Sequence, residues 1–299
     1  MQQTGCETSE PSMGRPLKDF FLERPQTAER IHLGQRLMPS ELPRLYTGKP
    51  RVGLVITTYG AAPYVELGLA ARQRLYPTLP VLVHDDASPD RDALLQLCNR
   101  YGAAFESNSS SLGHEMGDLS GIIGGLHWAR SAQLDLLVKM SRRFVPLSDW
   151  VEPLLGLAEM TQFGTFGRRC VDFNLAMRTE CFVMAVQPWT QPDILDEMTA
   201  FMLRNRISLL VEHYLLQFAQ RVYERNSIAA QQWERTALRP TPRLPFAEWG
   251  FLSEGRRHHS PNYLWHETAP AEAYMQMAVA LGLSFAPDAF SGILSQAQR

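Results

Sequence analysis

Short apolar runs alternate with longer amphipathic segments from about residue 50 onward. The apolar runs have the length and composition of buried strands, and they are residues 52–57, 80–84, 103–106 and 134–139. The segments between them repeat apolar residues at helical spacing, and they are residues 63–75, 90–101 and 115–132. This alternation predicts an α/β fold with a mostly parallel, Rossmann-like sheet flanked by helices.

The pattern changes beyond Trp150. The predicted helices are residues 151–161, 192–205, 209–225 and 271–283, and the predicted strands are residues 163–168 and 174–184. Residues 237–261, rich in Pro and Arg, are expected to form a long functional loop. Residues 1–48 have little periodicity and predict a flexible lead-in with at most one short helix, at 20–37.

Charge and hydropathy describe a globular protein without a bulk electrostatic partner. The chain of 299 residues is 45% hydrophobic, and 29 basic side chains nearly balance 31 acidic ones. This balance argues against nucleic acid or an anionic membrane as a partner. No stretch has the features of a secretory signal or a membrane-spanning helix, so we expect a cytoplasmic protein without a transmembrane segment.

The four cysteines are scattered along the chain without a CxxC pair. They are Cys6, Cys98, Cys170 and Cys181. Three of them lie in apolar surroundings, where a buried, reduced thiol is the usual state. The pattern favours a reducing compartment and disfavours a zinc site.

Polar residues follow the ends of the predicted strands. In an open α/β sheet, ligands bind beyond the carboxyl ends of the strands, so these residues are candidates for a site. The stretches are Thr57-Thr58-Tyr59-Gly60, His84-Asp85-Asp86-Ala87-Ser88 and Lys139-Met140-Ser141-Arg142. A further polar stretch, residues 112–118, opens the third predicted helix.

The segments VGLVITTYGAAPYVELGLAA and LPVLVHDDASPDRDALL resemble the N-terminal half of the family 2 glycosyltransferases, which have the GT-A fold. The resemblance covers about residues 50–225. It implies a nucleotide-sugar donor whose nucleoside binds Thr57, Tyr59, Asp85 and Asp86. A carboxylate can accept hydrogen bonds from a base or ribose, and a tyrosine ring can stack on a base. The alternative for HDDASPD is an acidic turn that caps a helix.

The chain departs from the family after the fourth strand. Members normally have Asp-x-Asp there, which holds a divalent cation on the diphosphate, but this chain has Lys139-Met140-Ser141. These residues are poor ligands for a hard cation. We expect no divalent metal, with the diphosphate bound near Lys139, Ser141 and Arg142. The alternative is a solvated basic turn that includes Arg143.

The segment LLVEHYLLQFAQRVY resembles the family helix that provides the catalytic base. Glu212 matches the family's glutamate, and His213 stands at the aspartate position. Either group could remove a proton from the acceptor hydroxyl. Asp118 is a third candidate base. The alternatives are an amphipathic helix with both residues exposed and, for Asp118, a carboxylate that interacts with the helix dipole.

The loop segment EGRRHHSPNYLWHE is basic and aromatic. GT-A enzymes often fold such a loop over the donor, which implies that Arg257 and His258 contact the diphosphate. A solvated loop and a transition-metal site remain as alternatives. On this interpretation residues 1–48 are a lead-in, 49–150 a nucleotide-sugar-binding half, and 151–299 an acceptor half with a loop lid and a C-terminal helix.

The sequence therefore favours a hexosyltransferase that moves a sugar from a UDP- or GDP-sugar to an acceptor hydroxyl, with inversion and without a metal. The acceptor, whether glycan, lipid-linked sugar, protein or small molecule, is not specified. An inactive nucleotide-sugar-binding or scaffold protein and a nucleotidyltransferase are the alternatives. A dehydrogenase of the Rossmann type is excluded because no GxGxxG follows the first strand.

Overall fold

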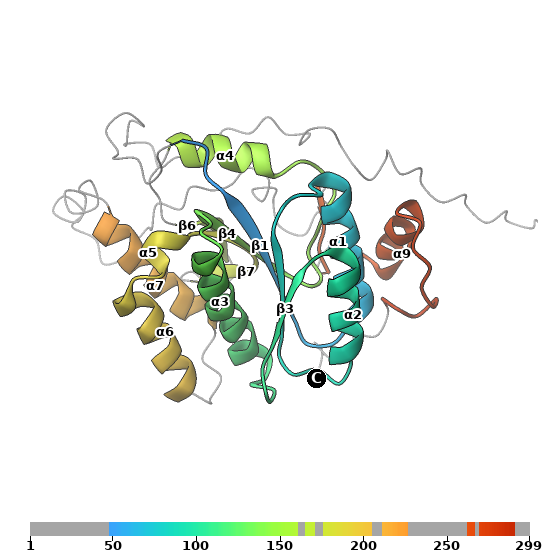
Figure 1. The fold of residues 1–299 in the computed structure, drawn as a ribbon, viewed down its shortest axis with the longest axis horizontal. Coiled ribbons are helices and arrows are strands. Elements are labelled where there is room, and N and C mark those ends of the chain that lie inside the picture. Colours follow the sequence, from blue (N-terminus) through green and yellow to red (C-terminus); the bar gives the residue numbers. More distant parts are fainter. Residues whose placement is uncertain are drawn as a thin grey trace, which may run out of the picture.

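The computed structural model describes residues 48–160, 165–170, 176–204, 211–226, 262–266 and 269–290. The helix predicted at 20–37 and the loop predicted at 237–261, with Arg257 and His258, lie outside these residues. Every other predicted helix and strand is confirmed with ends within three residues of those expected. The fold is α/β, as predicted, with one mostly parallel sheet flanked by helices (Figure 1).

The central sheet has the strand order β3-β2-β1-β4-β7-β6. The bounds of these strands are β1 Val52–Thr58, β2 Val81–Asp85, β3 Ala104–Ser107, β4 Leu136–Ser141, β6 Thr165–Cys170 and β7 Ala176–Ala185. The first four strands are parallel, with Thr58 of β1 opposite Asp85 of β2 and Thr57 opposite Ser141 of β4. This register brings the carboxyl ends of β1, β2 and β4 to one edge.

The last two strands run antiparallel, and they extend the same sheet beyond residue 150. β7 pairs with β4, so that Cys181 lies opposite Met140 and Ala185 lies opposite Leu136. β6 then pairs with β7. Because β7 runs in the opposite direction, its amino-terminal half lies beside the carboxyl end of β4.

Helices cover the sheet and fill the hydrophobic core (Figure 1). Their bounds are α1 Ala62–Leu75, α2 Arg91–Tyr101, α3 His114–Ser131, α4 Val151–Met160, α5 Val186–Trp189, α6 Pro192–Arg204, α7 Val211–Asn226 and α9 Ala271–Ala280. α3 packs on β1, β2 and β4 and also contacts α6 and α7, while α1 packs beside α2. Within the described ranges, no helix is both long enough and apolar enough to cross a bilayer.

Two very short strands, which periodicity did not predict, attach the C-terminal segment to the body. β5 (Val145–Pro146) pairs antiparallel with β8 (Tyr263–Leu264). The hydroxyl of Tyr274 on α9 donates a hydrogen bond to the carbonyl of Arg143, at 2.7 Å. A second apolar cluster surrounds this attachment, with the rings of Tyr64 and Tyr274 in edge contact at 5.0 Å between centroids. These contacts hold the chain that follows β4 in place.

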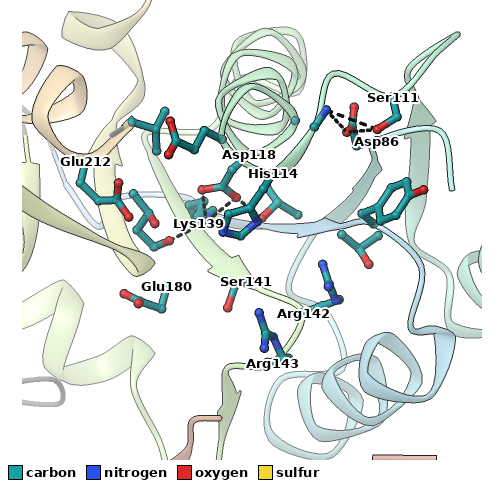
Figure 2. A pocket seen from close by; sticks show the side chains of 18 of the residues that line it. Asp86, Ser111, His114, Asp118, Lys139, Ser141, Arg142, Arg143, Glu180 and Glu212 are labelled. Carbon is teal, nitrogen blue, oxygen red and sulfur yellow. Dashed lines mark hydrogen bonds and ion pairs between the residues drawn. The ribbon is translucent and has the colours of Figure 1, made fainter. Parts of the chain in front are cut away.

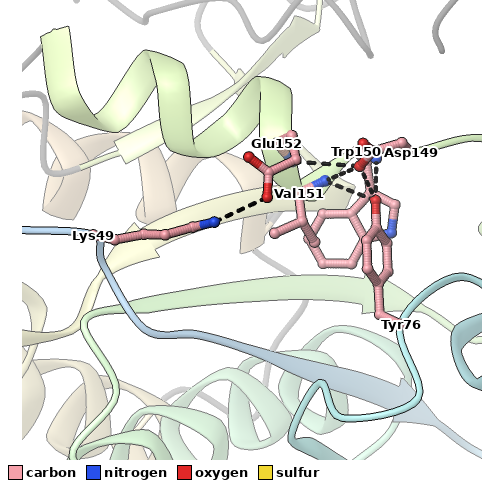
Figure 3. A network of polar contacts seen from close by, with 6 residues as sticks. All are labelled: Lys49, Tyr76, Asp149, Trp150, Val151 and Glu152. Atoms are coloured by element: carbon pink, nitrogen blue, oxygen red, sulfur yellow. Dashed lines mark hydrogen bonds and ion pairs between the residues drawn. The ribbon is translucent and has the colours of Figure 1, made fainter.

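Tyr76, just beyond α1, closes the amino terminus of α4 (Figure 3). Its hydroxyl donates to the carboxylate of Asp149 and accepts the backbone N–H groups of Trp150 and Val151, at 2.8 and 3.1 Å. Asp149 in turn accepts the N–H groups of Val151 and Glu152 and so caps the helix. Burial and the neighbouring carboxylate raise the pKa of Tyr76, which therefore stays a neutral donor.

α3 approaches β1 closely at Gly121, where a glycine faces the sheet. A Cβ atom at Gly121 would lie 2.5 Å from the Cγ2 atom of Thr57 and 3.3 Å from Nδ1 of His84. Thr57 is buried and β-branched, so it has little freedom to move away. The close approach sets the distance between α3 and β1 at the level of Thr57.

We expect Gly121→Ala to destabilise the fold, although alanine is the better helix former. Overpacking against Thr57 should lower the free energy of unfolding by about 1–3 kcal/mol, which exceeds the gain of up to about 1 kcal/mol from helix propensity. Equilibrium urea denaturation measures the difference.

Gly156→Ala in α4 is the matched control, because no atom of the described residues lies within 4 Å of the position of its Cβ. It should leave stability unchanged or raise it by up to about 1 kcal/mol. A gain of similar size in both variants would contradict the close approach of α3.

Candidate active site

A pocket opens where the carboxyl ends of β1, β2 and β4 meet the amino terminus of α3 (Figure 2). Its volume is about 740 Å³, and β7, α7 and His266 complete its wall. Of the predicted site residues, the structure brings eight to this pocket: Thr57, Tyr59, Asp86, Asp118, Lys139, Ser141, Arg142 and Glu212. The pocket therefore joins residues that are distant in the sequence.

Asp85 and Asp86 both have protein donors. Asp85 is fully buried and does not belong to the pocket lining; its carboxylate accepts the backbone N–H and the hydroxyl of Ser88 and the hydroxyl of Ser107. Asp86 lines the pocket and is 3% exposed. Its carboxylate accepts bonds from the loop that precedes α3: the side chains of Asn108 and Ser111 and the backbone N–H groups of Leu112 and Gly113.

These donors explain how two adjacent carboxylates are accommodated. Their mutual repulsion is offset by hydrogen bonds to each charged group, so no ligand is needed to explain them. A Cβ atom at Gly117 would lie 2.5 Å from Oδ2 of Asp86, so a glycine is required where Asp86 meets the first turn of α3. The acidic turn thus holds the loop before α3, as well as lying beside the pocket.

The end of β1 contributes one inward and one outward side chain. Thr57 is buried, and its hydroxyl donates to Oδ1 of Asp118 at 2.6 Å. The Tyr59 ring lies at the pocket and is 48% exposed. An exposed aromatic face at a pocket rim is suited to stacking on a planar ligand group.

Lys139 is fixed by three protein oxygens. Its ammonium group lies 2.7 and 2.8 Å from the two carboxylate oxygens of Asp118 and 2.5 Å from the carbonyl of Thr179. Its side chain is 1% exposed. Since an ammonium group has three donors, a direct bond to a diphosphate would require one of these contacts to break.

The residues at the end of β4 do not fit a divalent cation. Lys139 already provides a positive charge against Asp118, and Met140 is buried in the core. Mg²⁺ and Mn²⁺ prefer oxygen ligands, and an ammonium group beside the carboxylate repels them. In the part of the chain that the structure describes, no group of three or more His, Cys, Asp or Glu side chains is arranged to hold a metal ion.

Ser141 and Arg142 form the basic end of the pocket together with Arg143 (Figure 2). The Oγ atom of Ser141 and the Nε atom of Arg142 are buried and have no hydrogen-bond partner among the described residues. Burial, and then the neighbouring charge of Arg143, lowers the pKa of Arg142 to about 10. Arg142 is still charged at neutral pH, and a desolvated guanidinium with an unused donor is a ready site for an anion.

Glu212 lies at the opposite, acidic end, beside Glu180 (Figure 2). Burial raises the pKa of its carboxyl group, and the negative charges of Glu180, Asp118 and Glu115 raise it further. A carboxylate with a raised pKa is a stronger base than an exposed one. Asp118, the other described candidate base, is paired with Lys139. The carboxylate of Glu212 is therefore the better placed of the two to accept a proton.

The side chains of three predicted site residues lie outside the described part of the structure. The backbone of His213 lies in α7, but its side chain is outside the described part of the structure, as are Arg257 and His258. Their roles stay predictions.

Sequence reasoning did not select Glu180, His114 or Glu115 for the site. Glu180 reaches the pocket because β7 is antiparallel, which brings its amino-terminal half to the ligand-binding edge. Inspecting only the carboxyl ends of strands cannot find such a residue. His114 and Glu115 begin α3 in a stretch that the sequence did mark as polar, although only Asp118 was selected from it.

Comparisons with known proteins add solved structures of low similarity. No family model and no curated protein sequence matches the chain. A mannosyltransferase from Pyrobaculum calidifontis, in complex with GDP-Man and Mn²⁺, is 14% identical, covering 88% of this chain and 72% of that one, with a TM-score of 0.42. The glycosyltransferase GlyE of Streptococcus pneumoniae is 10% identical, covering 84% and 64%, with a TM-score of 0.44. A cytidylyltransferase from Leptospira borgpetersenii is 11% identical, covering 57% and 71%, with a TM-score of 0.34. At these identities and TM-scores, the likeness does not indicate which reaction the chain catalyses.

The raised pKa of Glu212 predicts a cost to stability at neutral and alkaline pH. A carboxyl group whose pKa is higher in the folded than in the unfolded chain stabilises the fold while protonated, and this contribution is lost as the pH rises through the folded value. Glu212→Gln should therefore be more stable than the wild-type chain at about pH 8 and equally stable at about pH 4, where both side chains are neutral. Chemical denaturation across this range measures the difference, and a less stable variant at the higher pH would contradict it.

Proposed function

We propose that the chain is a glycosyltransferase of the GT-A type that moves a sugar from a nucleoside diphosphate to an acceptor hydroxyl, with inversion and without a divalent metal. One observation supports this most: a basic end, where Ser141 and Arg142 have donors without a partner among the described residues, and a candidate base at Glu212 face the same pocket. Transfer from a nucleotide sugar needs both groups, one for the leaving diphosphate and one for the attacking hydroxyl.

The donor would lie across the ends of β1, β2 and β4. Tyr59 at the rim offers a face for the base, and Asp86 lies between this rim and the start of α3. The diphosphate would lie against Arg142 and Ser141, whose donors have no other described partner. The sugar would then point toward the acidic end of the pocket.

In the transfer step, Glu212 accepts the proton of the acceptor hydroxyl as its oxygen attacks the anomeric carbon. The bond between that carbon and the diphosphate oxygen breaks, and its electron pair leaves with the nucleoside diphosphate. Negative charge develops on the leaving group, where the buried guanidinium of Arg142 and the hydroxyl of Ser141 stabilise it. Donors that are already in place need no reorganisation during the reaction.

The main argument for the proposed metal independence is the position of Lys139. The family that the sequence resembles uses a metal ion at the end of β4, but here an ammonium group pairs with Asp118 at that place. The positive charge that faces the diphosphate would come from Arg142 and Arg143, which line the pocket. We therefore expect UDP or GDP, and their hexose conjugates, to bind in the presence of a chelator.

Calorimetric titration with UDP, GDP and their sugar conjugates tests the donor site. We expect binding in EDTA that Mn²⁺ leaves unchanged. Arg142→Gln should weaken it about tenfold to a hundredfold, because it removes charge-assisted hydrogen bonds. Arg130→Gln, an exposed arginine at the far end of α3, is the control and should bind like the wild-type chain.

Binding that requires Mn²⁺ would contradict the metal-free site. Absence of binding under both conditions would contradict the transferase and favour a protein of this fold without that activity.

Glu212→Gln tests the base separately from the donor site. The variant should keep its affinity for the nucleotide, because Glu212 lies at the other end of the pocket, and should lose about 10²- to 10⁴-fold in turnover. Release of UDP or GDP from the sugar donor, with water and with screened acceptors, measures the rate. Full activity in the variant would remove Glu212 from the mechanism.

A further inference from the structure

Three elements meet at the ammonium group of Lys139. The lysine comes from β4, Asp118 from the second turn of α3, and the carbonyl of Thr179 from β7. Thr57 of β1 completes the arrangement by donating to the same carboxylate. A side chain that is 1% exposed and bonded to protein oxygens at 2.5–2.8 Å has one position.

We propose that Lys139 is a positioning residue: its ammonium group holds and neutralises Asp118 and so sets the charge that Glu212 experiences. In this role Lys139 acts on the reaction through Asp118 and Glu212, without contacting the diphosphate. The inference deepens the proposed function, on which the role of Glu212 as a base rests. The electrostatic coupling between the Lys139–Asp118 pair and Glu212 does not depend on that function, because it requires only that these side chains line one pocket.

The acidic end of the pocket shows why this neutralisation matters. The described charges that act on Glu212 are those of Glu180 from β7 and of Glu115 and Asp118 from α3, and Lys139 from β4 lines the same pocket. Three of these four are carboxylates, and Asp118 is among the charges that raise the pKa of Glu212. With the ammonium group present, Asp118 belongs to a neutral pair, and its effect on Glu212 is reduced.

The pair therefore tunes the pH at which Glu212 loses its proton. Without the ammonium group, an uncompensated carboxylate would favour the protonated form of Glu212. Without the carboxylate, an uncompensated ammonium group would favour the ionised form. Removing the charge of Lys139 and removing that of Asp118 must therefore shift the pKa of Glu212 in opposite directions. A loss of local packing does not predict shifts of opposite sign.

Carbon-detected NMR of the Glu212 carboxyl group, in protein labelled at glutamate, tests the coupling without nucleotide or acceptor. The signal is assigned by its absence from Glu212→Gln. Lys139→Met should shift the titration of Glu212 to higher pH, and Asp118→Asn should shift it to lower pH. The double variant, Lys139→Met with Asp118→Asn, should return the midpoint toward the wild-type value.

Shifts of the same sign in the two single variants, or no shift in either, would overturn the proposal. Lys139→Met leaves Asp118 with the Thr57 hydroxyl and 18% side-chain exposure, and thermal denaturation verifies that it folds. If it does not fold, Asp118→Asn and the double variant still decide the question. The double variant lacks both charges and must titrate at a higher pH than Asp118→Asn.

The two proposals can fail separately. If the chain binds no nucleotide sugar but the shifts have opposite signs, the coupling is present and the transferase assignment is wrong. If it transfers sugar but the shifts have equal signs or are absent, Lys139 does not act through Glu212.

Discussion

The arrangement of the pocket depends on one buried positive charge. The ammonium group of Lys139 is almost fully enclosed, and an enclosed charge is tolerated only when opposite charge and hydrogen bonds surround it. Asp118 and the carbonyl of Thr179 meet this requirement, which brings α3 and β7 to the end of β4. One lysine therefore links three elements of the pocket wall, which are β4, α3 and β7.

A second charge, the carboxylate of Asp86, organises the loop that leads into α3. Four donors from the loop before α3 surround it, and Gly117 lets the first turn of α3 approach. Both charged groups are thus satisfied by the protein before any ligand arrives. Ser141 and Arg142 keep donors that no described residue uses, and these are the donors that a ligand would meet. Such preorganisation stabilises developing charge in catalysis.

The alternation of strands and helices was readable from the sequence because each buried strand and each amphipathic helix repeats apolar residues with its own period. The fold class and most element ends follow from that local pattern. β5 and β8 were not predicted, because two residues are too few to show a period. The direction of β7 was also not predicted, since a strand has the same pattern whichever way it runs, and Glu180 was therefore missed.

The sequence by itself determined which polar residues follow the strands and that no Asp-x-Asp occurs at residues 139–141. It predicted that Lys139 lies near a ligand, because the lysine follows an apolar run. Only the tertiary structure decided that its donors belong to Asp118 and Thr179. It also decided that Asp85 is enclosed and that Arg142 keeps a donor without a partner in the described part of the chain. The reason is physical: a charge selects its partners by distance in space, and those partners lie 21 and 40 residues away along the chain.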